Sequence, residues 1–175
     1  TLLGLYPRTG CRFVGMDPTA AKFLRYYRPD IEPVPDFFSS AAFDRATNGG
    51  RAKIVTSIAM FYDIEDPLAF VRQVRDILAP DGIWLLEQSH LLAMLEMTSY
   101  DTICHEHIEY YCLTQIEWMC SRAGLKIIDV GFSDANGGSF AVMVCHENGP
   151  YLPNESAINT ARKLESDAGL NNMEP

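Results

Sequence analysis

The chain reads KIVTSIAMFYDIEDPLAFVRQVRDILAPDGIWLL over residues 53–86. Its first apolar segment, residues 53–60, predicts a buried strand, and Asp66 and Pro67 then supply an N-cap and a first helical residue. The apolar positions that follow recur at helical spacing until a Pro-Asp-Gly sequence ends the helix, and residues 83–86 predict a second strand. A strand, a helix and a strand in this order indicate two parallel strands joined by a crossover helix.

The same alternation extends toward the amino terminus. Residues 11–17 read CRFVGMD, a short apolar strand that ends in an acidic residue, and a helical pattern begins at Pro18. A second apolar run around residues 34–38 precedes a polar stretch that ends at Asn48 and two glycines. These segments extend the strand and helix alternation ahead of residues 53–86.

A hairpin closes the pattern on the carboxyl side. Residues 125–132 and 139–146 predict two strands joined across Asn136 and two glycines, which is the turn chemistry of an antiparallel hairpin. Thr114 and Glu117 have the spacing of a capping box at the head of the preceding helix. We therefore expect an α/β fold, with a mostly parallel sheet, helices on both faces and a C-terminal antiparallel hairpin.

Length and composition narrow the class of protein. The 175 residues suit one compact domain, and 47% hydrophobic against 21% charged residues predict a buried core. The net charge of −9 opposes binding to nucleic acid and to anionic membranes. Because no apolar run approaches the roughly 20 residues of a membrane span, a cytoplasmic protein is expected. Five cysteines without a CxxC pair indicate buried thiols in a reducing compartment.

Candidate ligand-binding residues follow three of the predicted strands. Asp17 ends the first strand, where a carboxylate suits either a ribose diol or the N-cap of the next helix. Asp36 and Phe37 end the second strand, where they suit an adenine, although a phenylalanine alone also suits the core. Ser57 and Ile58 leave the third strand among small residues, which fits backbone contact with a ligand or simply a tight strand end.

The most unusual stretch is YDTICHEHIEYY, residues 100–111, which places His105, Glu106 and His107 side by side. A carboxylate beside an imidazole increases its basicity, as a general base near neutral pH requires. In an extended chain His105 and His107 face the same side and suit a metal ion, but a third ligand at suitable spacing is missing, so no metal site is predicted. Hydrogen-bonded structural histidines are the third interpretation.

Taken in order, six segments resemble the S-adenosylmethionine-dependent C-methyltransferases that act on nucleotide-linked sugars. The segments are VGMDP, VPDFFS, TSIAMFYDIEDP, LAPDGIWLLEQS, YDTICHEHIEYYCL and AGLKIIDVGFSDANGGSF, within residues 14–140. Members of that family methylate carbon 3 of 4-keto-deoxysugars. The resemblance implies a class I methyltransferase domain, S-adenosylmethionine as the cofactor and a nucleotide-sugar substrate.

The resemblance also implies how the chain is divided. In the family, a zinc-binding module with paired cysteines precedes a methyltransferase domain whose first strand ends in a glycine-rich loop. Neither is found in this sequence, and Thr1-Leu2-Leu3 resembles the residues just after that loop. We therefore expect residues 1–150 to form a partial methyltransferase domain without its first strand, and residues 151–175 to begin a truncated C-terminal lobe. Zinc is expected only in the absent module.

Roles for the cofactor-binding residues follow from the same resemblance. Asp17 corresponds to the residue that binds the ribose hydroxyls of the cofactor. Asp36 and Phe37 correspond to its adenine contacts. Ser57 and Ile58 correspond to positions along its methionine end.

The resemblance assigns catalysis to the histidine-rich stretch. His107 corresponds to the general base and Glu106 to its carboxylate neighbour, whereas Cys104 stands where the family often has tyrosine. The base removes a proton from the sugar carbon next to the ketone, and the enolate attacks the sulfonium methyl group. Two other functions remain open. Asp17 after a strand also suits a nicotinamide-dependent oxidoreductase, and a chain without the glycine-rich loop suits a non-catalytic binding fragment.

Overall fold

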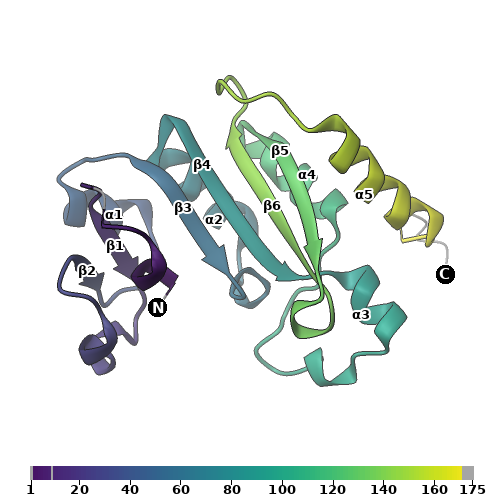
Figure 1. Ribbon diagram of the computed structural model, residues 1–175, viewed down its shortest axis with the longest axis horizontal. Helices are drawn as coiled ribbons and strands as arrows, with labels where there is room; N and C mark the ends of the chain where they lie inside the picture. The colour runs from purple at the N-terminus through teal and green to yellow at the C-terminus, as the bar shows by residue number, and fades with distance from the viewer. Residues whose placement is uncertain (1, 9, 171–175) are drawn as a thin grey trace. The chain divides into compact units, whose positions relative to one another are not determined.

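The computed structural model describes residues 2–8 and 10–170. The chain forms two compact units, Thr1–Arg51 and Ala52–Pro175, each with a sheet of its own (Figure 1). Thr1 of the stretch expected to follow the glycine-rich loop, and residues 171–175 of the expected C-terminal lobe, lie outside the described residues.

The first unit is built on two parallel strands, β1 (Phe13–Met16) and β2 (Ile31–Val34), which pair residue by residue along their whole length. The other elements are the 3₁₀ helices η1 (Leu2–Leu5), η2 (Ala20–Lys22) and η3 (Leu24–Tyr26) and the α-helix α1 (Ser40–Thr47). The strand predicted within residues 11–17 is confirmed, whereas the second strand lies earlier than the predicted run around residues 34–38 and ends at Val34.

The helix predicted from Pro18 onward is instead the pair of 3₁₀ turns η2 and η3. The Asp17 carboxylate accepts hydrogen bonds from the backbone N–H and the hydroxyl of Thr19, at 2.6 and 2.7 Å, which closes a tight turn. Phe23 and Tyr27 then close single turns by donating their N–H groups three residues back. Ala20, Ala21 and Lys22 are good helix formers, so local propensity does not account for the two separate turns.

The polar stretch before Gly49 contains α1, which was not predicted as a helix. Its N-cap Ser39 accepts the N–H of Ala42 at 3.1 Å. The helix ends at Asn48, which adopts a left-handed conformation with φ 55°. Both ends of α1 are therefore set by ordinary capping residues that the sequence shows.

Four strands form the sheet of the second unit, in the order β3-β4-β6-β5. They are β3 (Ala52–Ile58), β4 (Leu78–Ser89), β5 (Leu125–Ser133) and β6 (Ser139–His146). The strands β3 and β4 are parallel, whereas β6 runs antiparallel to both β4 and β5. The predicted parallel pair and hairpin are confirmed, but the sheet of this unit is mixed rather than mostly parallel.

The helix α2 (Pro67–Ile77) connects β3 to β4. Its N-cap Asp66 accepts the N–H of Ala69 at 2.9 Å, and Pro67 occupies the first helical position, as predicted. Its buried residues are Phe70, Val71, Val74 and Ile77. This spacing places one apolar stripe against the sheet.

Helices cover one face of this sheet. The helices α2 and α4 (Leu113–Ala123) contact each other and lie together behind the strands in Figure 1. On strand β4, Trp84 and Leu86 are fully buried, while on neighbouring strands Ile54 and Met143 are exposed. The prediction of helices on both faces is therefore wrong within this unit.

The start of α4 differs from the predicted capping box. Cys112 is the N-cap, and its backbone N–H donates to the side-chain oxygen of Gln115 at 2.9 Å. Thr114 lies inside the first turn, where its hydroxyl donates to Glu165 at 3.1 Å. The helix ends at Gly124, which has φ 71° and satisfies the last carbonyls from a left-handed conformation.

Four shorter elements and one longer helix complete the second unit. They are η4 (Phe61–Asp63), α3 (Leu91–Met97), η5 (Tyr100–Thr102), η6 (Ala135–Gly137) and α5 (Glu155–Asp167). Figure 1 shows α5 on the β5 side of the sheet, and the two elements are in contact. Within the described part of the chain, no helix has the length and apolar content to cross a lipid bilayer.

Candidate active site

In the first unit, Asp17 and Asp36 follow the carboxyl ends of the parallel strands β1 and β2. The N–H of Asp17 donates to the carbonyl oxygen of Val34 at 3.1 Å, so both residues lie at the same edge of this small sheet. Ligands of open parallel sheets bind at this edge. Because the Asp17 carboxylate accepts two hydrogen bonds from Thr19, it also closes the turn that follows the strand.

Phe37 is held beside Asp36 and is 76% exposed. The Asp36 carboxylate accepts the N–H of Phe37 at 2.9 Å, and its other oxygen lies 3.5 Å from the guanidinium of Arg45. The interpretation of Phe37 as a core residue is therefore wrong. A carboxylate and an open aromatic ring at a strand end can contact a flat, polar-edged ring by hydrogen bonding and packing.

In the second unit, Ser57 and Ile58 end strand β3 and face opposite ways. Ser57 is 4% exposed, and its hydroxyl accepts the indole N–H of Trp84 at 3.0 Å. Ile58 is partly exposed on the other face. The N–H of the next residue, Ala59, donates to the backbone carbonyl oxygen of Glu87 at 2.8 Å. Ala59 has φ 51°, and this left-handed conformation turns the chain out of the strand. The Ser57 hydroxyl therefore points into the core of the second unit.

The imidazole of His107 is held in one tautomer. Its Nδ1 lies 2.7 Å from the carbonyl oxygen of Thr102. A carbonyl only accepts hydrogen bonds, so Nδ1 carries the proton, and in the neutral ring the lone pair is on Nε2. A histidine with a fixed ring whose neutral form has its lone pair on Nε2 has the tautomer that a general base acting through Nε2 requires.

The segment after β3 supports this imidazole. The Tyr62 ring packs on the His107 ring with centroids 4.2 Å apart, and the Tyr62 carbonyl accepts the N–H groups of Ile108 and Glu109 at 3.0 and 3.1 Å. Its neighbour Phe61 is fully buried in the core. A core anchor therefore fixes Tyr62, and Tyr62 fixes the chain on the carboxyl side of His107.

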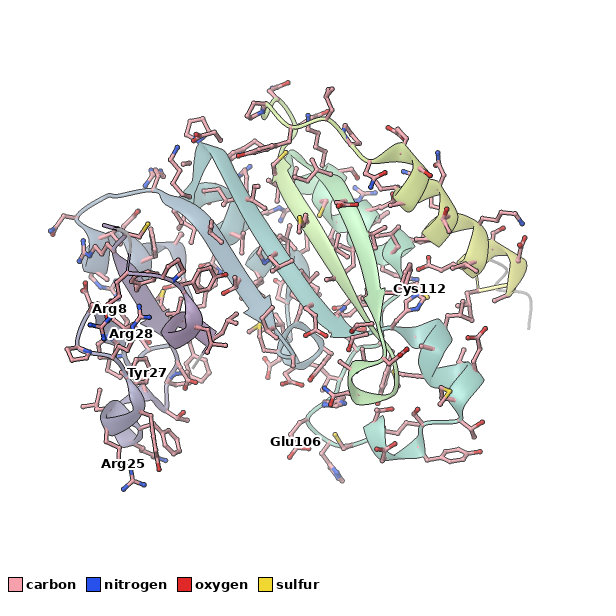
Figure 2. The ribbon with its side chains drawn as sticks, in the orientation of Figure 1. Arg8, Arg25, Tyr27, Arg28, Glu106 and Cys112 are labelled. Carbon is pink, nitrogen blue, oxygen red and sulfur yellow. The ribbon has the colours of Figure 1, made fainter. Side chains whose placement is uncertain are left out.

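An acidic side chain, Asp63, lies close to His107. Burial raises the pKa of Asp63; the charge of Glu106 raises it further, and that of His107 opposes the rise. Asp63 therefore lies close enough to both His107 and Glu106 to interact with them through charge. Glu106 itself is exposed on the loop outside the carboxyl ends of β3 and β4, as Figure 2 shows. His105 is exposed as well.

Sequence reasoning left Asp63 out of the candidate site. Its position soon after the end of a strand was the available signal, but the chain offers several acidic residues in the same loop. The folded structure brings Asp63 close enough to His107 for their charges to interact.

A buried polar cluster was also missed. One donor atom each from His90, Cys112 and Glu165 lies within 4.8 Å of the others, and all three residues are buried. Figure 2 shows Cys112 between the sheet and α5. The three residues come from separate elements spread over much of the chain, so no local spacing indicates the cluster.

Comparison with known proteins identifies the family. The sequence matches the methyltransferase domain family over residues 2–130. C-methyltransferase NovU of Streptomyces niveus is 34% identical over 143 residues, a match that covers 80% of this chain and 34% of NovU. The chain therefore spans about a third of the length of this curated relative.

Solved structures show the same fold. LepI in complex with SAM superposes with a TM-score of 0.62 at 14% identity, over 83% of this chain and 39% of LepI. A SAM-dependent methyltransferase from Anabaena variabilis superposes with a TM-score of 0.62 at 16% identity, over 83% of this chain and 70% of that protein. The fold is the α/β class I methyltransferase fold with a mixed sheet. Since the family match covers most of the sequence, the chain belongs to the methyltransferase domain family.

Proposed function

We propose that this chain is part of an enzyme that transfers a methyl group from S-adenosylmethionine to a carbon atom of a nucleotide-linked keto-deoxysugar. The similarity to a C-methyltransferase and the HEH stretch support this proposal. The observation that carries it is the hydrogen bond from His107 Nδ1 to Thr102, because it leaves Nε2 as the basic atom. A base with its lone pair on a defined nitrogen is what removal of a proton from carbon requires.

The first unit would bind the adenosine part of the cofactor. The Asp17 carboxylate at the end of β1 suits the ribose hydroxyls, and Asp36 with the exposed ring of Phe37 suits the adenine. These residues fit the group because their side chains lie at a strand edge and are exposed. In the second unit, Ser57 through its backbone and Ile58 through its partly exposed side chain would lie along the methionine end.

The division of the chain stays a prediction. Residues 1–150 as a partial methyltransferase domain, residues 151–175 as the start of a C-terminal lobe, and a first strand outside this sequence all rest on the resemblance to sugar C-methyltransferases. Zinc would be bound only by the amino-terminal module of that family.

Proton transfer is the step that this chain's residues perform. The hydrogen on a sugar carbon next to a ketone is acidic, and Nε2 of His107 takes it while the electron pair moves into the enolate. The Thr102 carbonyl holds the ring through Nδ1, and the nearby carboxylate of Asp63 would stabilise the imidazolium that forms, together with Glu106, which is next to His107 in the sequence. S-adenosylmethionine, when bound, supplies the electrophilic methyl group that the enolate carbon takes.

The substitution His107→Asn tests this function in the full-length protein. The asparagine amide nitrogen lies about where Nδ1 lies, so the hydrogen bond to Thr102 is retained while the basic nitrogen is lost. We expect methyl transfer to fall by about 10²-fold or more, with unchanged S-adenosylmethionine affinity in calorimetry. His105→Asn is the matched control and is expected to keep full activity. Wild-type turnover in the His107 variant would refute the assignment.

A further inference from the structure

A long segment, here called the His107 loop, connects β4 to α4. It comprises residues 91–111. The two ends of the loop meet. The N–H of Leu91 donates to the Tyr111 carbonyl at 3.0 Å, and the backbone amide of Leu92 hydrogen-bonds the Cys112 thiol. The loop is therefore closed at its base.

One carboxylate from α5 sits at this base. Glu165 is 0% exposed. Its Oε1 lies 3.1 Å from Nε2 of His90, just before the loop, and accepts the N–H of Leu113, just after it, at 2.5 Å. Its Oε2 accepts the N–H and the hydroxyl of Thr114 at 3.3 and 3.1 Å. A single side chain thus binds both ends of the loop.

The partners of Glu165 explain how a carboxylate can be buried. Burial alone would raise the pKa of Glu165, but the hydrogen bonds from His90, Leu113 and Thr114 outweigh burial and lower it. Glu165 also lies at the amino-terminal end of α4, where the helix dipole favours a negative charge. The His90 ring is packed against Phe132 and Phe140, with centroids 5.2 and 5.0 Å away, so its direction is fixed.

We propose that Glu165 is a positioning residue that clamps the base of the His107 loop and so places the His107 imidazole. The clamp itself follows from the contacts, whereas its effect on catalysis rests on the proposed function. The helix α5 lies beyond residues 2–130 that match the family, so this contribution comes from outside the matched segment.

The contacts favour a hydrogen-bonded clamp over a metal centre. Both carboxylate oxygens of Glu165 already accept hydrogen bonds, which orient their lone pairs toward the loop ends. Burial and the charge of Glu165 raise the pKa of Cys112 to about 12, so the thiol keeps its proton at neutral pH. A metal ion would have to displace this proton and the hydrogen bonds that the Glu165 carboxylate accepts.

Hydrogen–deuterium exchange tests the clamp without any assay of activity. We expect Glu165→Gln to speed exchange in residues 91–111 by about tenfold or more, with β4 and β6 unchanged, because the amide group cannot accept from all of these donors. Glu155→Gln, an exposed matched change on the same helix, is expected to leave the loop unchanged. Wild-type exchange in the Glu165 variant, or loop exchange that a chelator or added Zn²⁺ alters in the wild type, would overturn the clamp.

A second pair of variants covers the case in which Glu165→Gln does not fold. Glutamine at position 90 keeps an N–H donor about where Nε2 of His90 lies, whereas leucine has none. His90→Leu is expected to loosen the loop and His90→Gln to restore its protection. Equal exchange in the two variants would count against the clamp.

Kinetics separate the clamp from the proposed function. In the full-length protein, Glu165→Gln is expected to lower kcat by about tenfold or more with unchanged cofactor affinity. Loss of activity in His107→Asn together with wild-type kcat and loop exchange in Glu165→Gln would refute the clamp alone. A loosened loop in Glu165→Gln together with full activity in His107→Asn would refute the function and leave the clamp intact.

Discussion

Nδ1 of His107 lies 2.7 Å from the carbonyl oxygen of Thr102, five residues earlier in the same loop. This contact fixes both the direction of the ring and the nitrogen that carries the proton. Tyr62 packs on the same ring from the segment after β3. The imidazole is therefore held by its own loop and by a second element that is anchored in the core.

Asp63 is expected to weaken the fold at neutral pH. Burial raises its pKa above the ordinary value of 3.8, so the folded protein binds the proton more tightly than the unfolded chain does. This destabilisation is present above the pKa that Asp63 has in the folded protein, and it disappears below the pKa that Asp63 has in the unfolded chain. Asp63→Asn should therefore raise the free energy of unfolding at pH 7, by less than about 1 kcal/mol for such an exposed group, and give no gain at pH 3.

Urea unfolding at the two pH values measures this difference. Asp101→Asn changes another exposed carboxylate of the His107 loop region and serves as the control. A gain of equal size at pH 3 and pH 7 would show that the effect does not come from ionisation of Asp63.

Asp17 is expected to bind the ribose of the cofactor as well as to close its turn. Asp17→Ala removes both functions, whereas Thr19→Val removes only the hydroxyl that donates to Asp17. A hydrogen bond to a charged group contributes about 1.5–3 kcal/mol, so Asp17→Ala should weaken S-adenosylmethionine binding by about tenfold or more in calorimetry. Thr19→Val should leave the affinity unchanged. Equal affinity in all three proteins would reduce Asp17 to a turn-closing residue.

Gly138 allows the β5–β6 turn to approach the His107 loop. A Cβ atom at Gly138 would lie 2.4 Å from the Cβ of Ala93 on α3, and the glycine has φ 119°. Gly138→Ala should therefore destabilise the protein by about 1–3 kcal/mol, as overpacking does. Because the clash is with one methyl group, the loss should be smaller when Ala93→Gly is also present. Thermal unfolding of the four proteins of this cycle measures the coupling, and an additive result would argue against the close approach.

The sequence predicted those helix ends that are set by residues adjacent in the chain. Asp66 and Pro67 begin α2 as expected because cap and first turn are adjacent in sequence. The start of α4 could not be predicted in the same way. The hydroxyl of Thr114, predicted as the cap, instead donates to Glu165, which lies 51 residues later. A contact with a residue so distant in the sequence cannot be inferred from the spacing of residues within the helix.

The same distinction between local and long-range contacts applies to the candidate site. The HEH stretch and the acidic residues at strand ends were found because their residue types are unusual at those positions. The hydrogen bond that fixes His107, the charge of Asp63 beside it and the clamp at Glu165 depend on the path of a loop through space. Hydrophobic periodicity and capping residues contain no information on that path.

Proton removal from carbon is the central claim, and it can be measured without methyl transfer. The full-length protein is incubated in D₂O with a nucleotide-linked 4-keto-deoxysugar and no methyl donor, and NMR follows exchange of the hydrogen on the carbon next to the ketone. The wild type is expected to exchange this hydrogen faster than the uncatalysed sugar does, and His107→Asn about 10²-fold or more slower than the wild type. Equal exchange rates in the wild type and the variant would contradict the role of His107 as the base.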